Sequence, residues 1–149
     1  MKTRLYFSRT IGFSIGCLLS VLLSTGVCRA RTPDDKNDKL LETLQKISEQ
    51  TNKSCPVAFD ATTSLKGTTV IVPRTLRFLV TVPDSTQVET LRRGAVPLLR
   101  TMVADTPGMK PLRDGGTIFS FWFETPGNGH LFDFEVTPED YRKKAKKKR

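Results

Sequence analysis

The sequence predicts an α+β domain in which a helix, a β-hairpin, a second helix and a second β-hairpin follow one another. Two stretches, at about residues 38–51 and 86–102, carry apolar residues at the three- and four-residue spacing of a helix. Residues 75–82 alternate in side-chain direction, and aromatic residues crowd two runs around a turn at 126–129. We expect about four antiparallel strands in one sheet, with both helices on one face.

The first helix follows a polar lead-in at residues 31–37, which we expect to be flexible. The helix is predicted over residues 38–51, because four apolar side chains form one stripe and charged residues occupy the opposite side. The stripe consists of Leu40, Leu41, Leu44 and Ile47. Asn52 follows as a stop signal.

The first hairpin is predicted from two neighbouring runs. Residues 68–72 are β-branched throughout, which favours a strand over a helix. Residues 75–82 point alternately to the two sides, as in a half-buried strand. Pro73 lies between them, so the sequence leaves the type of turn open.

The second helix begins at a capping-box pattern, Thr86 with Glu89 three residues later. Its apolar face continues to Met102. Pro97 lies inside this stretch and lacks an amide donor, so we expect it to kink the helix or to divide it. The Pro- and Gly-rich residues 107–116 then predict an irregular loop.

The last hairpin is dense in aromatic residues and is predicted to anchor the core. On each strand three apolar side chains share a face, and burial of each aromatic side chain contributes about 2 kcal/mol. The two rows are Phe119, Phe121 and Phe123 on one strand, and Phe132, Phe134 and Val136 on the other.

Three residues in or beside the loop are candidates for a binding edge. The loop carries Met109 and Arg113, and Trp122 lies nearby, out of phase with the Phe row of its strand. An exposed tryptophan is typical of interface anchors. The alternative is that the loop is a tight connector and that Trp122 packs under a helix.

The chain begins with the pattern of an export signal over residues 1–30. A basic start precedes an uncharged, apolar run at residues 11–27, and the small residues Cys28 and Ala30 follow. Cleavage after Ala30 would leave a periplasmic or secreted domain at residues 38–138. An uncleaved inner-membrane anchor is the alternative, because the run approaches the roughly 18 apolar residues of a spanning helix. Lipid attachment at Cys28 is a further alternative.

Basic residues concentrate at the other end, where residues 139–149 are predicted to form a disordered tail. The net charge is +9, but residues 31–141 contain 13 basic and 15 acidic side chains, so the domain itself is close to neutral. The tail predicts attraction to anionic phospholipid or another envelope polyanion, with a purely solubilising role as the alternative. Export argues against nucleic acid as a partner. The charges include Lys143, Lys144, Lys146, Lys147, Lys148 and Arg149.

Chemically reactive residues are few beyond residue 30. There is one cysteine, Cys55, and one histidine, His130, with no motif that spaces ligands for a metal, so we predict no metal, cofactor or catalytic group. Cys55 is either buried as a small apolar residue or free to pair with another chain. A nucleophile pair of Cys55 with His130 is an alternative that needs the two to meet in space. Asp114 is interpreted as a turn residue or a partner of Arg113.

Several short motifs carry a resemblance. They are N-x-x-C-P at residues 52–56, T-x-L at 63–65 and a T-P-G-M-K run at 106–110. With Asp60 and the stretch 113–116 they resemble a loosely defined group of uncharacterised small exported bacterial proteins, over roughly residues 38–136. The resemblance implies export and a helix–hairpin–helix–hairpin fold, and no activity. The basic tail is not part of it.

The sequence therefore predicts an exported, non-enzymatic domain that binds a protein or envelope partner through its sheet or through residues 107–116. The alternative is a small exported hydrolase or an enzyme-inhibitor protein whose site uses Asp114, Arg113 or Cys55.

Overall fold

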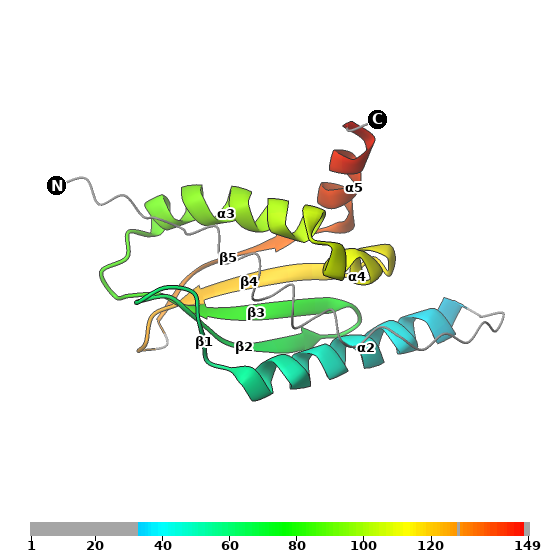
Figure 1. Cartoon of the computed structure of the whole chain (residues 1–149), viewed down its shortest axis with the longest axis horizontal. Coiled ribbons are helices and arrows are strands. Elements are labelled where there is room, and N and C mark those ends of the chain that lie inside the picture. The colour runs from blue at the N-terminus through cyan, green and yellow to red at the C-terminus, as the bar shows by residue number, and fades with distance from the viewer. Residues whose placement is uncertain (1–32, 128, 148–149) are drawn as a thin grey trace.

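The computed structural model describes residues 33–127 and 129–147 of the 149-residue chain, and the side chains of residues 36–127 and 129–142. The predicted signal peptide and its cleavage site lie outside these ranges. Within them, no helix is both long and apolar enough to cross a bilayer. The elements, drawn in Figure 1, are α2 (Pro33–Ser54), β1 (Val57–Ala58), β2 (Ser64–Ile71), β3 (Thr75–Thr81), α3 (Val88–Asp105), the 3-10 helix η1 (Pro107–Met109), α4 (Lys110–Asp114), β4 (Ile118–Glu124), β5 (His130–Val136) and α5 (Pro138–Lys147).

The five strands form one mixed sheet in the order β1-β2-β3-β4-β5. The two predicted hairpins are confirmed, since β2 pairs with β3 and β4 pairs with β5, both antiparallel. The expectation of four antiparallel strands was wrong in detail, because β3 and β4 run parallel and the short β1 adds a fifth strand. Parallel neighbours need a long crossover connection, and α3, η1 and α4 supply it.

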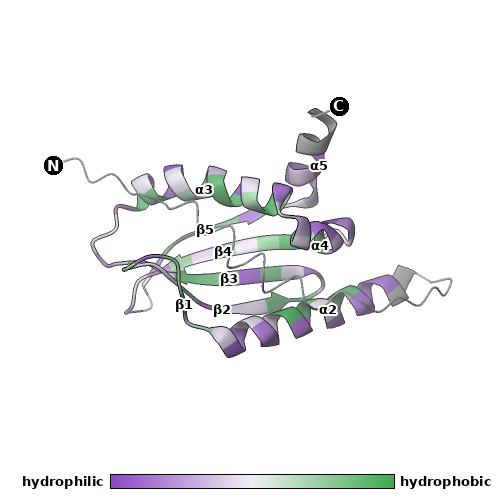
Figure 2. Ribbon diagram, viewed as in Figure 1, coloured by the Kyte–Doolittle hydropathy of each residue, from purple (hydrophilic) through white to green (hydrophobic). Residues whose placement is uncertain are grey.

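The α-helices α2 and α3 cover the same face of the sheet. α2 packs along β2 and α3 along β5 (Figure 1). Leu44 of α2 and Val103 of α3 are fully buried in the same core as Phe121 of β4. Figure 2 shows apolar residues along both helices and along the strands that they cover.

Aromatic side chains link β3, β4 and β5 on this covered face. Phe78 of β3 stacks on Phe121 of β4 with ring centroids 5.1 Å apart, and Phe121 stacks on Phe134 of β5 at 5.2 Å. Phe123 and Phe132 form a second stacked pair at 4.6 Å. The two Phe rows that the alternation predicted are thus in the core, in register across the sheet.

Helices occupy more of the chain than the sequence predicted. α2 begins at Pro33, so residues 33–37 of the expected lead-in are helical, and residues 107–114 form η1 and α4 instead of an irregular loop. α5 occupies residues 138–147, where we expected a disordered tail. Tyr141 gives the physical reason for α5: it is buried and packs edge-on against Phe119, with centroids 6.4 Å apart.

Pro97 does not divide α3, which is continuous from Val88 to Asp105. Pro97 and Arg93, four residues earlier, are both exposed. The carbonyl that the missing amide leaves unpaired therefore faces water, which limits the cost of the proline. The helix also starts later than predicted, with Gln87 at the N-cap position and no side-chain cap from Thr86.

Asn52, predicted as a helix stop, has a different role at the edge of the sheet. Its side-chain amide accepts a hydrogen bond from the Thr68 N–H (2.6 Å) and donates one to the Thr68 carbonyl (2.9 Å). Ser48 Oγ also donates to that carbonyl, at 3.0 Å. The last turns of α2 therefore satisfy the outward main-chain groups of β2 in the way that a neighbouring strand would.

We expect Asn52→Ala to lower the free energy of unfolding by about 1–3 kcal/mol, because it leaves both main-chain groups of Thr68 without that partner. Chemical denaturation monitored by circular dichroism measures the change. Gln50→Ala, at an exposed position of the same helix, is the matched control. Equal stability of the two variants would show that Asn52 does not hold this edge.

Candidate functional site

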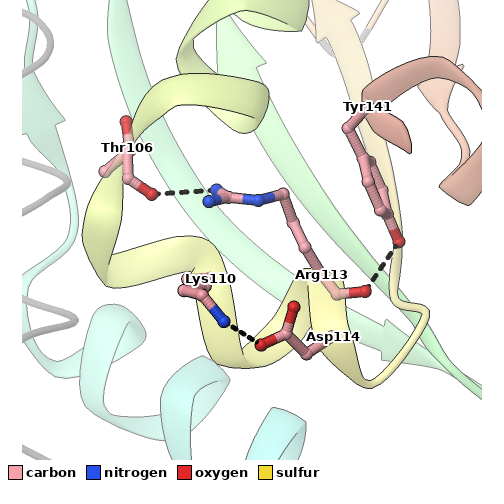
Figure 3. A network of polar contacts seen from close by, with 5 residues as sticks. All are labelled: Thr106, Lys110, Arg113, Asp114 and Tyr141. Atoms are coloured by element: carbon pink, nitrogen blue, oxygen red, sulfur yellow. Dashed lines mark hydrogen bonds and ion pairs between the residues drawn. The ribbon is translucent and has the colours of Figure 1, made fainter. Parts of the chain in front are cut away.

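Arg113, one of the predicted binding residues, caps the end of α3. One of its guanidinium nitrogens, Nη1, donates to the carbonyl oxygens of Val103 (2.6 Å) and Thr106 (2.8 Å). Figure 3 shows this side chain reaching across to Thr106, while the Tyr141 hydroxyl meets the carbonyl of Arg113. The last carbonyls of a helix lack intrahelical donors, and a cation there is favourable. Arg113 thus joins α3, α4 and α5.

The other residues of the 107–116 segment are also placed by packing. Met109 is fully buried and Leu112 is 2% exposed, so both contribute to the core. Asp114 pairs with Lys110 one helical turn earlier, and not with Arg113 (Figure 3). The structure therefore places Arg113 and Met109 inside the connection between α3 and β4, and away from Trp122.

Trp122 is half-buried and lies on the face of the sheet that none of the described helices covers. Its neighbours on β4, Phe121 and Phe123, point into the core, and the alternation of the strand directs Trp122 the other way. Cross-strand pairing places Leu79 of β3 and Asp133 of β5 on either side of it. We call this surface the open sheet face and define its central cluster as Lys66, Arg77, Trp122, Glu124, His130 and Asp133.

Two cationic or aromatic side chains hold the indole of Trp122. The guanidinium carbon of Arg77 lies 5.2 Å from the ring centroid, within the range of a cation–π contact. The imidazole of His130 lies on the indole with centroids 3.8 Å apart. Arg77 Nε also donates to Ser120 Oγ at 3.2 Å, which orients the guanidinium. The tryptophan is therefore ordered before any partner arrives.

Glu124 is the buried acidic group of the cluster. It is 8% exposed, and its two carboxylate oxygens accept hydrogen bonds from Lys66 Nζ (2.6 Å) and from Trp122 Nε1 (3.2 Å). A buried carboxylate is tolerated only when it is paired in this way. Lys66 reaches it from β2 across the width of β3, so the ion pair links β2 to β4.

His130 and Cys55 do not form the nucleophile pair considered from the sequence. Cys55 precedes β1 and His130 begins β5, so the other three strands, spaced by about 4.8 Å, lie between them. His130 lies 3.2 Å from Asp133 instead. Cys55 is half-buried, and burial raises the pKa of its thiol against the opposing effect of a backbone hydrogen bond at Val57. In the described part of the chain, no group of three potential metal ligands comes together.

Sequence reasoning found Trp122 but did not predict that Arg77, Glu124 and Lys66 gather around it. A signal for Arg77 was present, because it has the outward phase of its strand. The partnership with Trp122 was not visible, since it depends on β3 and β4 lying side by side. The predicted tail charges cannot be placed, because the side chains from residue 143 onward lie outside the described set.

The cluster offers contact chemistry: an indole, a guanidinium, an ammonium group and carboxylates on one surface. Such side chains recognise a partner by stacking, hydrogen bonding and charge. No protein-family model matches the sequence, and no curated protein is detectably similar to it.

Solved structures share the fold. The match to a predicted secreted protein from Pseudomonas aeruginosa has a TM-score of 0.62 and 20% identity, and covers 76% of this chain and all of that one. The type II secretion system pilotin AspS from Vibrio cholerae matches with a TM-score of 0.56 and 14% identity, over 72% of this chain and 96% of that one. The type 2 secretion system pilotin EpsS from Vibrio vulnificus matches with a TM-score of 0.57 and 10% identity, over 72% of this chain and 96% of that one. At these identities the likeness establishes the fold.

We expect Glu124→Ala to loosen the cluster, because the Trp122 N–H loses its acceptor and Lys66 loses its counter-charge. The loss of stability should be about 1–3 kcal/mol. Trp122 is the only tryptophan of the chain, so acrylamide quenching of its fluorescence reports its order directly and should increase. Glu49→Ala, which removes a carboxylate from an exposed position of α2, is the control. Unchanged quenching in Glu124→Ala would contradict the role given to this carboxylate.

Proposed function

We propose that this chain is an exported, non-enzymatic binding domain of the cell envelope, and that the open sheet face contacts a protein partner. The observation that carries this proposal is the state of Trp122. Its indole lies on the face that the described helices leave uncovered, contacts Arg77 and His130 and donates a hydrogen bond to Glu124, so it is positioned as an anchor. Aromatic and arginine side chains held in this way supply most of the energy at protein interfaces.

The fold supports a partner in a secretion system. Two of the solved structures that share it are type II secretion system pilotins, and a third is a predicted secreted protein. We therefore propose a pilotin-like role, in which the domain binds a protein component of an envelope secretion machine. Export through the signal peptide at residues 1–30, with cleavage near Ala30, fits such a location.

The basic tail is proposed to add electrostatic attachment to the envelope. Seven of the eight residues 142–149 are Lys or Arg, whereas the domain before them is close to neutral. A cationic segment near anionic phospholipid or another polyanion gains about 1 kcal/mol per charge at low salt. The tail would hold the domain near a membrane surface while the open sheet face remains available.

We expect Trp122→Ala to weaken capture of the envelope partner by about 30-fold, corresponding to about 2 kcal/mol for an interface anchor. Chemical cross-linking in native envelopes, followed by affinity capture and quantitative mass spectrometry, identifies and measures the partner. Leu98→Ala is the matched control, because Leu98 is a large apolar residue that is 40% exposed on α3. A specific partner that Trp122→Ala retains as well as the native chain does would rule out the open sheet face.

We expect neutralisation of the tail to reduce binding to anionic vesicles. The variant changes Lys143, Lys144, Lys146, Lys147, Lys148 and Arg149 to Gln and keeps the chain length. Sedimentation with phosphatidylglycerol vesicles at low salt should show at least a tenfold loss, and phosphatidylcholine vesicles should bind neither protein. Equal binding of both proteins to the anionic vesicles would eliminate the electrostatic role.

A further inference from the structure

The two edges of the sheet are treated differently. At one edge, β1 pairs with the start of β2, and the side chains of Asn52 and Ser48 occupy the main-chain groups of Thr68. At the other edge, β5 ends the sheet, and no described residue hydrogen-bonds to its outer side. Proteins usually protect an edge strand with a proline, a bulge, charged side chains or a covering segment. β5 has a register shift at Leu131 and carries the charged Asp133 and Glu135, but residues 132–136 contain no proline, and no described segment pairs with their outer side.

The register identifies the main-chain groups that this edge presents. In β4, the Ile118 N–H donates to Arg74 (3.0 Å), and the Glu124 carbonyl accepts from Val82 (2.9 Å), so both groups point towards β3. Alternation then directs the main chain of Phe121 towards β5, where its pair is Phe134. The residues on either side of Phe134 must present their N–H and C=O groups outwards.

Those two residues are Asp133 and Glu135, and both are exposed acids. Their side chains alternate with Phe132 and Phe134, so they project on the open sheet face. Among the described residues, Asp133 pairs only with His130, and Glu135 forms no ion pair. On the opposite side of the strand, Phe134 is only half-buried. The edge therefore combines main-chain groups that no described residue pairs with, two carboxylates on one side and apolar surface on the other.

This combination selects the occupant. A second copy of the chain, paired antiparallel about Phe134, would set Asp133 opposite Glu135 of the other copy, and like charges directly opposite one another are destabilising. A strand with Lys or Arg at alternate positions would instead place its cations beside these carboxylates. Apolar residues at the intervening positions would extend the surface of Phe134.

We propose that β5 receives an extended segment of the protein partner as a sixth strand, and that this segment alternates basic and apolar residues. This inference deepens the proposed function and rests on it, since it specifies how the partner is bound. Main-chain hydrogen bonds to Asp133 and Glu135 provide affinity, and the two carboxylates specify the sequence. The added strand would pair with β5 beyond Asp133, the cross-strand neighbour of Trp122, so β5 would separate it from β4.

The probe for the test is a blocked heptapeptide of alternating lysine and valine, compared with a peptide of the same composition in which the lysines are contiguous. We expect the alternating peptide to bind full-length protein more tightly, by fluorescence of Trp122 and by calorimetry. Amide hydrogen exchange gives the decisive measurement. The N–H groups of Asp133 and Glu135 should exchange quickly in the free protein and at least tenfold more slowly with peptide, whereas those of Phe132 and Phe134 are protected in both states.

Variants separate the main-chain contribution from the charge. Glu135→Ala removes the carboxylate and keeps the N–H, and we expect an affinity loss of about threefold to fivefold. Glu135→Pro also removes the outward N–H. An edge strand tolerates proline at such a position, and we expect the affinity for the peptide to fall by about a further fivefold. Glu135→Lys should weaken binding by at least tenfold. Glu49→Lys makes the same change of charge on exposed α2 and should bind within about twofold of the native chain.

Three outcomes would overturn the inference: equal binding of the two peptides, binding without slowed exchange at Asp133 and Glu135, or equal affinity of Glu135→Ala and Glu135→Pro when both are folded by circular dichroism. These results are separable from the proposed function. An envelope partner captured through Trp122 with no protection of the β5 edge leaves that function standing and removes this mode of binding. Peptide binding at the edge without any specific envelope partner supports this mode of binding and removes the proposed function.

Discussion

The parallel pairing of β3 with β4 is the contact on which the rest of this structure depends. It joins the two hairpins in one sheet and aligns Leu76, Phe78 and Val80 with Phe119, Phe121 and Phe123 on a single face. Parallel neighbours require a long crossover, so α3 and α4 must leave and re-enter the sheet between them. Burial of the combined apolar rows then draws α2 and α3 onto the same side.

The same pairing determines which side chains lie together on the uncovered face of the sheet. Because the described helices that pack on the sheet lie over the aromatic rows, none of them covers the other face, which carries the polar residues of alternating phase. Parallel register brings Arg77 next to Ser120 and within reach of Trp122, and Lys66 spans β3 to reach Glu124. The cost of burying the Glu124 carboxylate is offset by two hydrogen bonds, so the charged cluster and the core are consequences of one topology.

Sequence periodicity predicted the helices and both hairpins because it reports local geometry. The apolar stripe through Leu44 indicates a helix, and the alternation through Phe121 indicates a strand, whichever element packs beside them. The predictions failed where a distant contact decided the local state. The segment 107–114 is helical because Met109 and Leu112 can be buried, and α5 packs against the domain because Tyr141 meets Phe119.

By itself, the sequence determined the α+β class, the elements that supply the core, the outward phase of Trp122 and the concentration of positive charge at the C-terminus. Tertiary structure alone decided which hairpin edges meet, that Arg113 and Met109 serve the connection between α3 and β4, and that Arg77 and Glu124 hold the indole. It also decided that Asn52 closes one sheet edge, whereas no described residue pairs with the outer side of β5. The physical reason is that strands pair through main-chain groups, which every residue possesses. The side-chain pattern therefore specifies which face of a strand is buried, but it specifies much less strongly which other strand pairs with its edge.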